Sequence, residues 1–307
     1  MQGAKLTLQV KTQNEPFFME KIFGILAYPA GHSLSPVMHS AGFKALSLPY
    51  GFNIWDVQAE ELGDFMRALK SHSTVNLAVG KFPLDKVEGF SVSMPHKESI
   101  IPLLDGIDEA GNKVGAISCV YMRDGKFIGT NLDYIGVRGS LESSSYAAEH
   151  GLAGKKVIVL GAGGAAKAAV YGVLFLQMIP VLFNRTLEKA VCTAKQFAAH
   201  DLEIEAFSFR DLEAKSKDAE IIINCTPLGL GNDEKIVPDK VFSHIKLSLD
   251  AVYSSTPTIF QTQSALAGAE NLTGLEWLLH QGFEAFRLWT GKSAPKEVMR
   301  KSVVQSS

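Results

Sequence analysis

The sequence predicts an α/β protein of two domains, the second of which contains a doubly wound parallel sheet. Its length of 307 residues suffices for two hydrophobic cores. Short apolar runs alternate with longer amphipathic segments, and a second alternation of the same kind begins near residue 155. Repeated strand and helix units of this kind favour parallel sheets, because a helix connects each strand to its parallel neighbour.

The first half of the chain predicts strands at residues 22–27, 50–57 and 88–94 and helices at 37–46 and 60–69. Pro95 ends the third strand, since proline cannot donate a hydrogen bond to a sheet. Strands at 116–122 and 126–130 form a hairpin around an Asp-Gly turn. Residues 1–19 are polar and weakly patterned, as in an edge strand or a tail, and we regard them as an N-terminal extension.

The second half begins with an apolar strand at residues 157–160, which is followed by glycines and an alanine-rich helix at 165–176. Further strands are predicted at 181–183, 204–207, 221–225 and 247–252, with helices between them. A helix at 277–290 and another after Pro295 close the chain.

Composition excludes several classes of partner. The chain has 30 basic and 32 acidic residues without long runs of either sign, so it shows no footprint for nucleic acid or a membrane surface. Three cysteines without close pairing predict reduced thiols and a cytoplasmic protein, and no apolar stretch is long enough for a membrane span. Eight scattered histidines predict no metal site. The expected partner is a small molecule.

A glycine loop between the strand at 157–160 and the next helix predicts a dinucleotide site. It fits G-x-G-x-x-G/A with Ala166 last, and its candidate cofactor-binding residues are Gly161, Ala162, Gly163, Gly164 and Ala165. The glycines permit a tight turn and close approach of the backbone to a pyrophosphate. A glycine turn in another kind of α/β sheet is the alternative interpretation.

The end of the next strand predicts which dinucleotide binds. An NAD site usually has an acid there for the ribose hydroxyls, whereas this chain has Asn184, Arg185 and Thr186. A guanidinium pairs with a 2′-phosphate and Thr186 adds a hydrogen bond, so NADP is favoured over NAD. Lys189 adds a second positive charge, or is simply a solvated lysine on a helix.

Two polar stretches in the first half are candidates for substrate binding. Ser33 and Ser35 are alternate residues ahead of a helix and suit a carboxylate, although a helix-capping cluster explains them equally well. Residues 89–97 place Ser91 and Ser93 on one face of a strand, followed by Pro95 and Lys97. Lys97 is also consistent with an exposed first helical turn, and Asp133 with an N-cap.

Taken together, these stretches resemble the shikimate dehydrogenase family, in order from about residue 22 to residue 296. The resemblance implies that Lys97 and Asp133 are catalytic and that the N-R-T segment at 184–186 clamps NADP. It also implies a set of substrate-binding residues: Ser33, Ser35, Ser91, Ser93, Ser118, Tyr253 and Gln281.

The resemblance further implies an N-terminal α/β substrate-binding domain, residues 20–132 with 274–307, and a Rossmann-type NADP-binding domain, residues 133–273. The implied reaction is NADPH-dependent reduction of 3-dehydroshikimate to shikimate, with Lys97 as proton donor. A monomer or a homodimer is expected.

Two departures from the family pattern leave alternatives open. Ser91 and Ser118 stand where the family usually has asparagines, which have longer reach and more donors. A quinate/shikimate dehydrogenase, or another dehydrogenase of cyclitol carboxylates, therefore remains an alternative. A non-catalytic sensor of the ligand is a third hypothesis, and a folate-linked dehydrogenase is the rival at the level of fold, although it would leave the serine pair unexplained.

Overall fold

The computed structural model describes residues 9–11, 19–71, 75–77, 80–82, 84–198, 203–227, 235, 237–254 and 256–306. Packing divides the chain into two compact units. Unit 1 comprises Met1–Leu132 with Gly282–Ser307, and unit 2 comprises Asp133–Gln281. The sequence placed the return to the first domain at residue 274. Packing places it at Gly282, inside a helix, so no loop marks this boundary.

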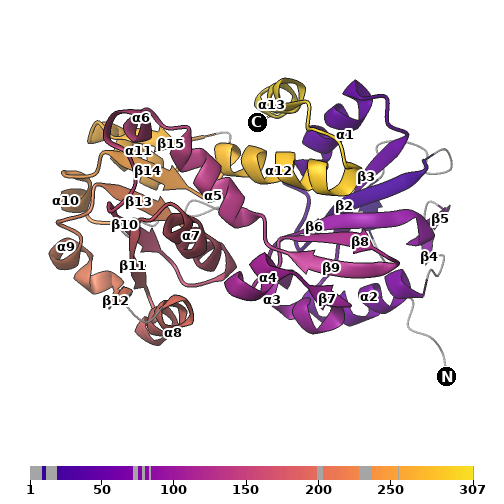
Figure 1. The fold of residues 1–307 in the computed structure, drawn as a ribbon, viewed down its shortest axis with the longest axis horizontal. Coiled ribbons are helices and arrows are strands. Elements are labelled where there is room, and N and C mark those ends of the chain that lie inside the picture. The colour runs from indigo at the N-terminus through magenta and orange to yellow at the C-terminus, as the bar shows by residue number, and fades with distance from the viewer. Residues whose placement is uncertain are drawn as a thin grey trace. The chain divides into compact units, whose positions relative to one another are not determined.

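Unit 1 contains a mixed sheet with the strand order β1-β3-β2-β6-β8-β9-β7. Figure 1 labels its strands from β2 to β9. Its strands are β1 (Gln9–Lys11), β2 (Lys21–Ala27), β3 (Tyr50–Asp56), β6 (Val87–Val92), β7 (Gly106–Ile107), β8 (Cys119–Arg123) and β9 (Lys126–Thr130). The strands β3, β2 and β6 are parallel neighbours, and β8 is antiparallel to β6. The carboxyl ends of β2, β3 and β6 therefore share an edge of the sheet with the start of β8. A separate antiparallel pair consists of β4 (Val75–Leu77) and β5 (Gly80–Phe82).

The predicted strands of the first half are confirmed, with boundaries that shift by up to three residues. At the turn of the hairpin β8–β9, Asp124 and Gly125 have φ of 52° and 72°, as a two-residue hairpin turn requires. Residues 9–11 form an edge strand antiparallel to β3, which was one of the two interpretations of the N-terminal segment.

Both faces of the unit 1 sheet are buried. On one face Ile22 and Leu26 of β2 pack with Trp55 and Phe90. On the other face Phe23 stacks on Trp289 at 5.2 Å between ring centroids, and the Trp289 indole donates a hydrogen bond to the carbonyl of Val120. Helices of this unit are α1 (Ser35–Ala45), α2 (Leu62–Lys70), α3 (His96–Ser99), α4 (Glu109–Val114) and α13 (Lys296–Val304), together with the C-terminal part of α12 (Gly274–Thr290).

Unit 2 is built on a parallel sheet with the order β12-β11-β10-β13-β14-β15 (Figure 1). Its strands are β10 (Lys156–Leu160), β11 (Ile179–Asn184), β12 (Glu205–Ser208), β13 (Ile221–Asn224), β14 (Leu247–Asp250) and β15 (Glu270–Leu272). Counted from β10, this order is 3-2-1-4-5-6, the doubly wound order of dinucleotide-binding sheets. The order reverses between β10 and β13, and the crevice at the carboxyl ends of these two strands is where such sheets bind their ligands.

Alternate residues of β10 belong to two different cores. Val157 and Val159 pack with α5, α7 and the start of α12, whereas Ile158 and Leu160 pack with α10 and α11. Helices therefore cover both faces of the sheet, as the sequence predicted. The helices are α5 (Asp133–Glu142), α6 (Ser145–His150), α7 (Gly164–Phe175), α8 (Leu187–Phe197), α9 (Leu212–Lys215), α10 (Asp239–Phe242), α11 (Ile259–Leu266) and the N-terminal part of α12. No helix in the described part of the chain is long and apolar enough to cross a membrane.

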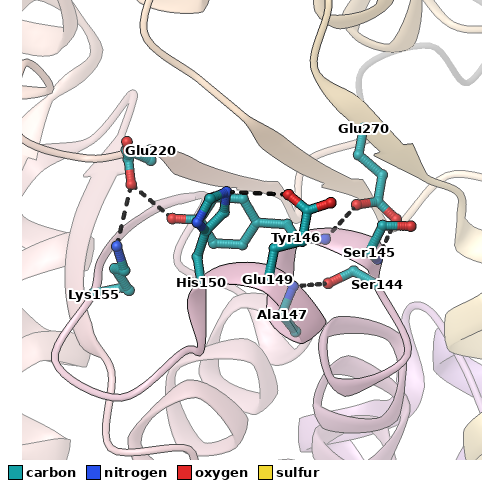
Figure 2. A network of polar contacts seen from close by, with 9 residues as sticks. All are labelled: Ser144, Ser145, Tyr146, Ala147, Glu149, His150, Lys155, Glu220 and Glu270. Atoms are coloured by element: carbon teal, nitrogen blue, oxygen red, sulfur yellow. Dashed lines mark hydrogen bonds and ion pairs between the residues drawn. The ribbon is translucent and has the colours of Figure 1, made fainter.

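A polar network fixes α6 at the amino edge of this sheet (Figure 2). The Glu270 carboxylate accepts hydrogen bonds from the backbone N–H groups of Ser145 and Tyr146 at 2.9 and 2.8 Å. The Tyr146 hydroxyl donates to Glu220 at 2.7 Å, and Lys155 lies 3.4 Å from the same carboxylate. Burial and the adjacent Glu220 raise the pKa of Tyr146. Because these residues lie at the edge opposite the glycine loop, we interpret the network as structural.

Candidate active site

The glycine loop connects the end of β10 to the start of α7. Gly161 has φ of 110°, and a Cβ there would lie 3.2 Å from the carbonyl oxygen of Cys225, so this position requires glycine. A Cβ on Gly163 would meet no atom of the described chain within 4 Å, which leaves open space in front of the loop. The first turn of α7 has no acidic residue, and the N–H groups at a helix start favour an anion. The loop thus fits a pyrophosphate.

The second predicted cofactor segment follows β11 at the same carboxyl edge. The side-chain amide of Asn184 donates to the carbonyl of Thr186 at 2.8 Å and so holds the turn. Arg185, Thr186 and Lys189 are exposed. Asn184 therefore shapes the turn, and the exposed residues are the ones able to reach a ligand.

A buried carboxylate network, which sequence patterns did not reveal, lies behind the crevice. Asp250, at the end of β14, is fully buried and accepts hydrogen bonds from Asn224, Thr258 and the backbone of Val252 at 2.9, 2.7 and 3.1 Å. Burial raises its pKa, although these hydrogen bonds oppose the shift. Asn224 in turn accepts the Thr226 hydroxyl at 2.6 Å. The network fixes the segments after β13 and β14, including the one that contacts Gly161. The sequence signal for this network is a polar residue at the end of each apolar strand, Asn224 in β13 and Asp250 in β14.

In unit 1 the serine pair lies in the turn that follows β2. The hydroxyl oxygen of Ser33 accepts the N–H of Ser35 at 3.2 Å, and Ser35 is the first residue of α1. Asp56, at the end of β3, accepts the N–H of Ala30 at 3.2 Å and holds the loop from the neighbouring strand. The backbone at the serine pair is therefore defined by a local hydrogen bond and a tertiary one.

The second polar stretch lies beside this turn. Tyr28–Pro29 and Met94–Pro95 are both cis peptide bonds, and the N–H of Tyr28 donates to the carbonyl of Met94 at 2.9 Å. Ser91 pairs in register with Ile25 of β2 and Cys119 of β8, while the N–H of Ser93 donates to the carbonyl of Leu26. Ser91 and Ser93 are both half-buried.

Lys97 is half-buried in the short helix α3, where its carbonyl accepts the N–H of Ile117 at 2.7 Å. The preceding residue, His96, is fully buried, and its Nε2 lies 2.7 Å from the carbonyl of Val57. Burial lowers the pKa of His96, so the ring is neutral near pH 7. This hydrogen bond ties the lysine turn to the end of β3.

Ser118 immediately precedes β8 at the same edge of the sheet. Its buried hydroxyl oxygen accepts the N–H of Leu132 at 2.7 Å, which fixes the end of the N-terminal segment of unit 1. The edge thus gathers six of the predicted residues, namely Ser33, Ser35, Ser91, Ser93, Lys97 and Ser118. Because the supporting residues Asp56 and His96 act through tertiary contacts, sequence patterns did not reveal them.

The three remaining predicted residues belong to unit 2. Asp133 is buried and is the first residue of α5. Tyr253 is half-buried and follows β14 by three residues, and Gln281 is half-buried in α12.

The two units define an α/β protein with a doubly wound dinucleotide-binding domain and a second domain that gathers hydroxyl and amino groups at one sheet edge. Three family descriptions match in order: shikimate dehydrogenase substrate binding domain (residues 25–120), shikimate/quinate 5-dehydrogenase (145–242) and shikimate 5′-dehydrogenase C-terminal domain (274–304).

Curated relatives of this chain are named for the same family as these descriptions. The protein called shikimate dehydrogenase (NADP(+)) of Thermococcus kodakarensis is 34% identical over 93% of this chain and 96% of its own length. The protein of that name from Staphylococcus aureus strain RF122 is 33% identical over 92% of this chain and 97% of its own length. The chain belongs to the shikimate dehydrogenase family.

Solved structures agree in fold. A shikimate dehydrogenase in complex with NADP+ superposes with a TM-score of 0.80 at 31% identity, over 95% of this chain and 99% of that one. The Thermus thermophilus enzyme in complex with NADP(H) and shikimate gives 0.79 at 27% identity, over 94% and 100%. A 5-ketofructose reductase of Gluconobacter gives 0.75 at 26% identity, over 94% and 100%.

Proposed function

We propose that the protein catalyses the NADPH-dependent reduction of 3-dehydroshikimate to shikimate, a step of aromatic amino acid biosynthesis. The observation that carries the proposal is the set of serine hydroxyls and the lysine at one edge of the unit 1 sheet. These groups suit a substrate with a carboxylate, ring hydroxyls and a ketone. The relatives' names and the Thermus structure with NADP(H) and shikimate support the same chemistry.

The residues of unit 2 fit NADP. Open space before Gly163 and the absence of an acid in the first turn of α7 suit the pyrophosphate, which residues 161–165 would hold. The exposed Arg185 guanidinium would pair with the 2′-phosphate, aided by Thr186 and Lys189. Asn184 would keep this turn in shape.

When bound, NADPH supplies a hydride to the ketone carbon. Lys97 donates a proton to the carbonyl oxygen as that oxygen gains negative charge, so the ketone becomes a secondary alcohol. Asp133 accepts hydrogen bonds that orient the lysine ammonium group and the substrate hydroxyls. This proton donor and its carboxylate partner are the proposed catalytic pair.

Substrate recognition is divided among the remaining polar residues. Ser33, Ser35 and Ser93 donate hydrogen bonds to the substrate carboxylate, because hydroxyl groups are donors and a carboxylate only accepts. The ring hydroxyls are bound by Ser91, Ser118, Tyr253 and Gln281. By this proposal residues 20–132 with 274–307 form the substrate domain and residues 133–273 the NADP domain. We also propose a cytoplasmic monomer or homodimer.

A second candidate function is oxidation of quinate or another cyclitol carboxylate. It is favoured by Ser91 and Ser118, since a serine reaches less far than an asparagine and leaves room for an additional substituent.

Initial rates of NADP reduction by the purified protein, with shikimate and with quinate side by side, test the proposal. Faster turnover of shikimate is the expected result. Faster turnover of quinate would establish the second candidate instead, and the absence of turnover with either substrate would overturn both.

A further inference from the structure

The strands β11 and β12 end side by side at the carboxyl edge of the unit 2 sheet. They are parallel, and Asn184, the last residue of β11, pairs in register with Ser208, the last residue of β12. Neighbouring strands lie about 4.8 Å apart. Arg185 follows the first strand by one residue and Arg210 follows the second by two, so both arginines leave the sheet at the same edge.

We propose that Arg210 supplies a second guanidinium to the adenosine 2′-phosphate of NADP, next to Arg185. This inference rests on the proposed function and adds a residue on another strand to the cofactor site. An arginine side chain exceeds the strand spacing in length, so two arginines on adjacent strand ends can contact one phosphate from two sides.

The turn after β12 holds Arg210 in place. The Ser208 hydroxyl oxygen accepts the N–H of Arg210 at 3.2 Å, and the Asp211 carboxylate accepts the N–H of Ser208 at 3.2 Å. These reciprocal bonds fix the backbone on both sides of Arg210. They also turn the Asp211 carboxylate back toward the strand.

No ion pair among the described residues neutralises the cations at this edge. Glu213, the next acid after Asp211, pairs with Lys240 at 2.7 Å. Within the described residues, no ion pair involves Arg185, Lys189 or Arg210, and all three are exposed. Two guanidinium groups and an ammonium group without anionic partners among the described residues are complementary in sign to a phosphate dianion.

Dissociation constants of NADPH, NADH and 2′,5′-ADP for the full chain test the proposal. Arg210→Ala is expected to weaken NADPH and 2′,5′-ADP about fivefold, the scale of one exposed charge on a phosphate, and NADH by less than twofold. Arg210→Lys keeps the charge and should recover most of the NADPH affinity. Lys246→Ala is the matched control, because Lys246 is exposed at the opposite edge of the same sheet, just before β14.

Unchanged NADPH affinity in Arg210→Ala, or equal weakening of NADPH and NADH, would overturn the role in 2′-phosphate binding. A loss in Lys246→Ala as large as in Arg210→Ala would do the same, since it would reflect net charge alone. The proposed function fails separately, when the wild-type protein reduces NADP with neither shikimate nor quinate.

Discussion

His39 is a buried imidazole whose replacement should change how stability depends on pH. It projects from α1 among aromatic rings, with its ring stacked on Phe52 at 4.9 Å and 3° and tilted against Trp289 at 4.9 Å. Only 1% of its surface is exposed, and its Nδ1 has no hydrogen-bond partner among the described residues. Burial lowers the pKa of His39 from 6.5 to about 3, so the ring is neutral in the fold.

The sign of the effect follows from proton binding. Between pH 6.5 and about 3 the unfolded chain binds a proton at His39 that the folded chain does not bind. The contribution of the neutral His39 to the free energy of unfolding is therefore fully present above its ordinary pKa of 6.5, and it decreases as the pH falls below that value. Each pH unit is worth about 1.36 kcal/mol, so going from pH 7 to pH 4.5 removes roughly 2.5 kcal/mol of unfolding free energy through His39 alone.

We predict that His39→Leu removes this dependence. Leucine has a similar volume and is favourable in a helix, so at pH 7 the variant should lie within about 1.5 kcal/mol of the wild type. Urea unfolding followed by tryptophan fluorescence at pH 7 and 4.5 should show that the variant loses about 2.5 kcal/mol less than the wild type. His32→Gln, at an exposed histidine, is the control and should keep the wild-type pH dependence. The same loss in wild type and His39→Leu would refute the reasoning.

Three further outcomes are expected. Lys97→Ala should lower kcat by roughly 10²–10⁴ at unchanged NADPH affinity, because a positioned proton donor is removed; unchanged turnover would exclude Lys97 from the mechanism. Arg185→Ala should weaken NADPH binding by roughly tenfold or more and leave NADH nearly unchanged, which titrations of both cofactors would check; equal losses would contradict the phosphate clamp. Asp250→Ala leaves three buried donors without their acceptor and should lower the free energy of chemical unfolding by about 3–4 kcal/mol. Asp250→Asn keeps an acceptor oxygen and should lower it by about 1 kcal/mol. Similar losses in the two variants would show that the hydrogen bonds are not what stabilises this region.

Elements with strong local patterns were predictable from the sequence, and contacts between distant segments were not. The strand, glycine loop and helix from β10 to α7 are contiguous, so spacing alone predicted their arrangement. The strand β15 was missed, because its three residues Glu270–Leu272 include only one buried apolar side chain. Two hydrogen bonds were missed because they join distant segments. The N–H of Leu132 donates to the Ser118 hydroxyl oxygen 14 residues away, and His96 is hydrogen-bonded to the carbonyl of Val57 39 residues away.

The alternation in β10 also restricts how this chain can change in evolution. Val157 and Val159 belong to one core and Ile158 and Leu160 to the other, and the glycine loop follows directly. Deleting one residue within the strand would turn the side chains of each core toward the other face of the sheet. Deleting two residues would return each side chain to its own face, but it would withdraw Gly161 from the edge of the sheet by about 6.6 Å. Length variation among descendants of this protein is therefore expected in its surface loops, with β10 retaining its number of residues.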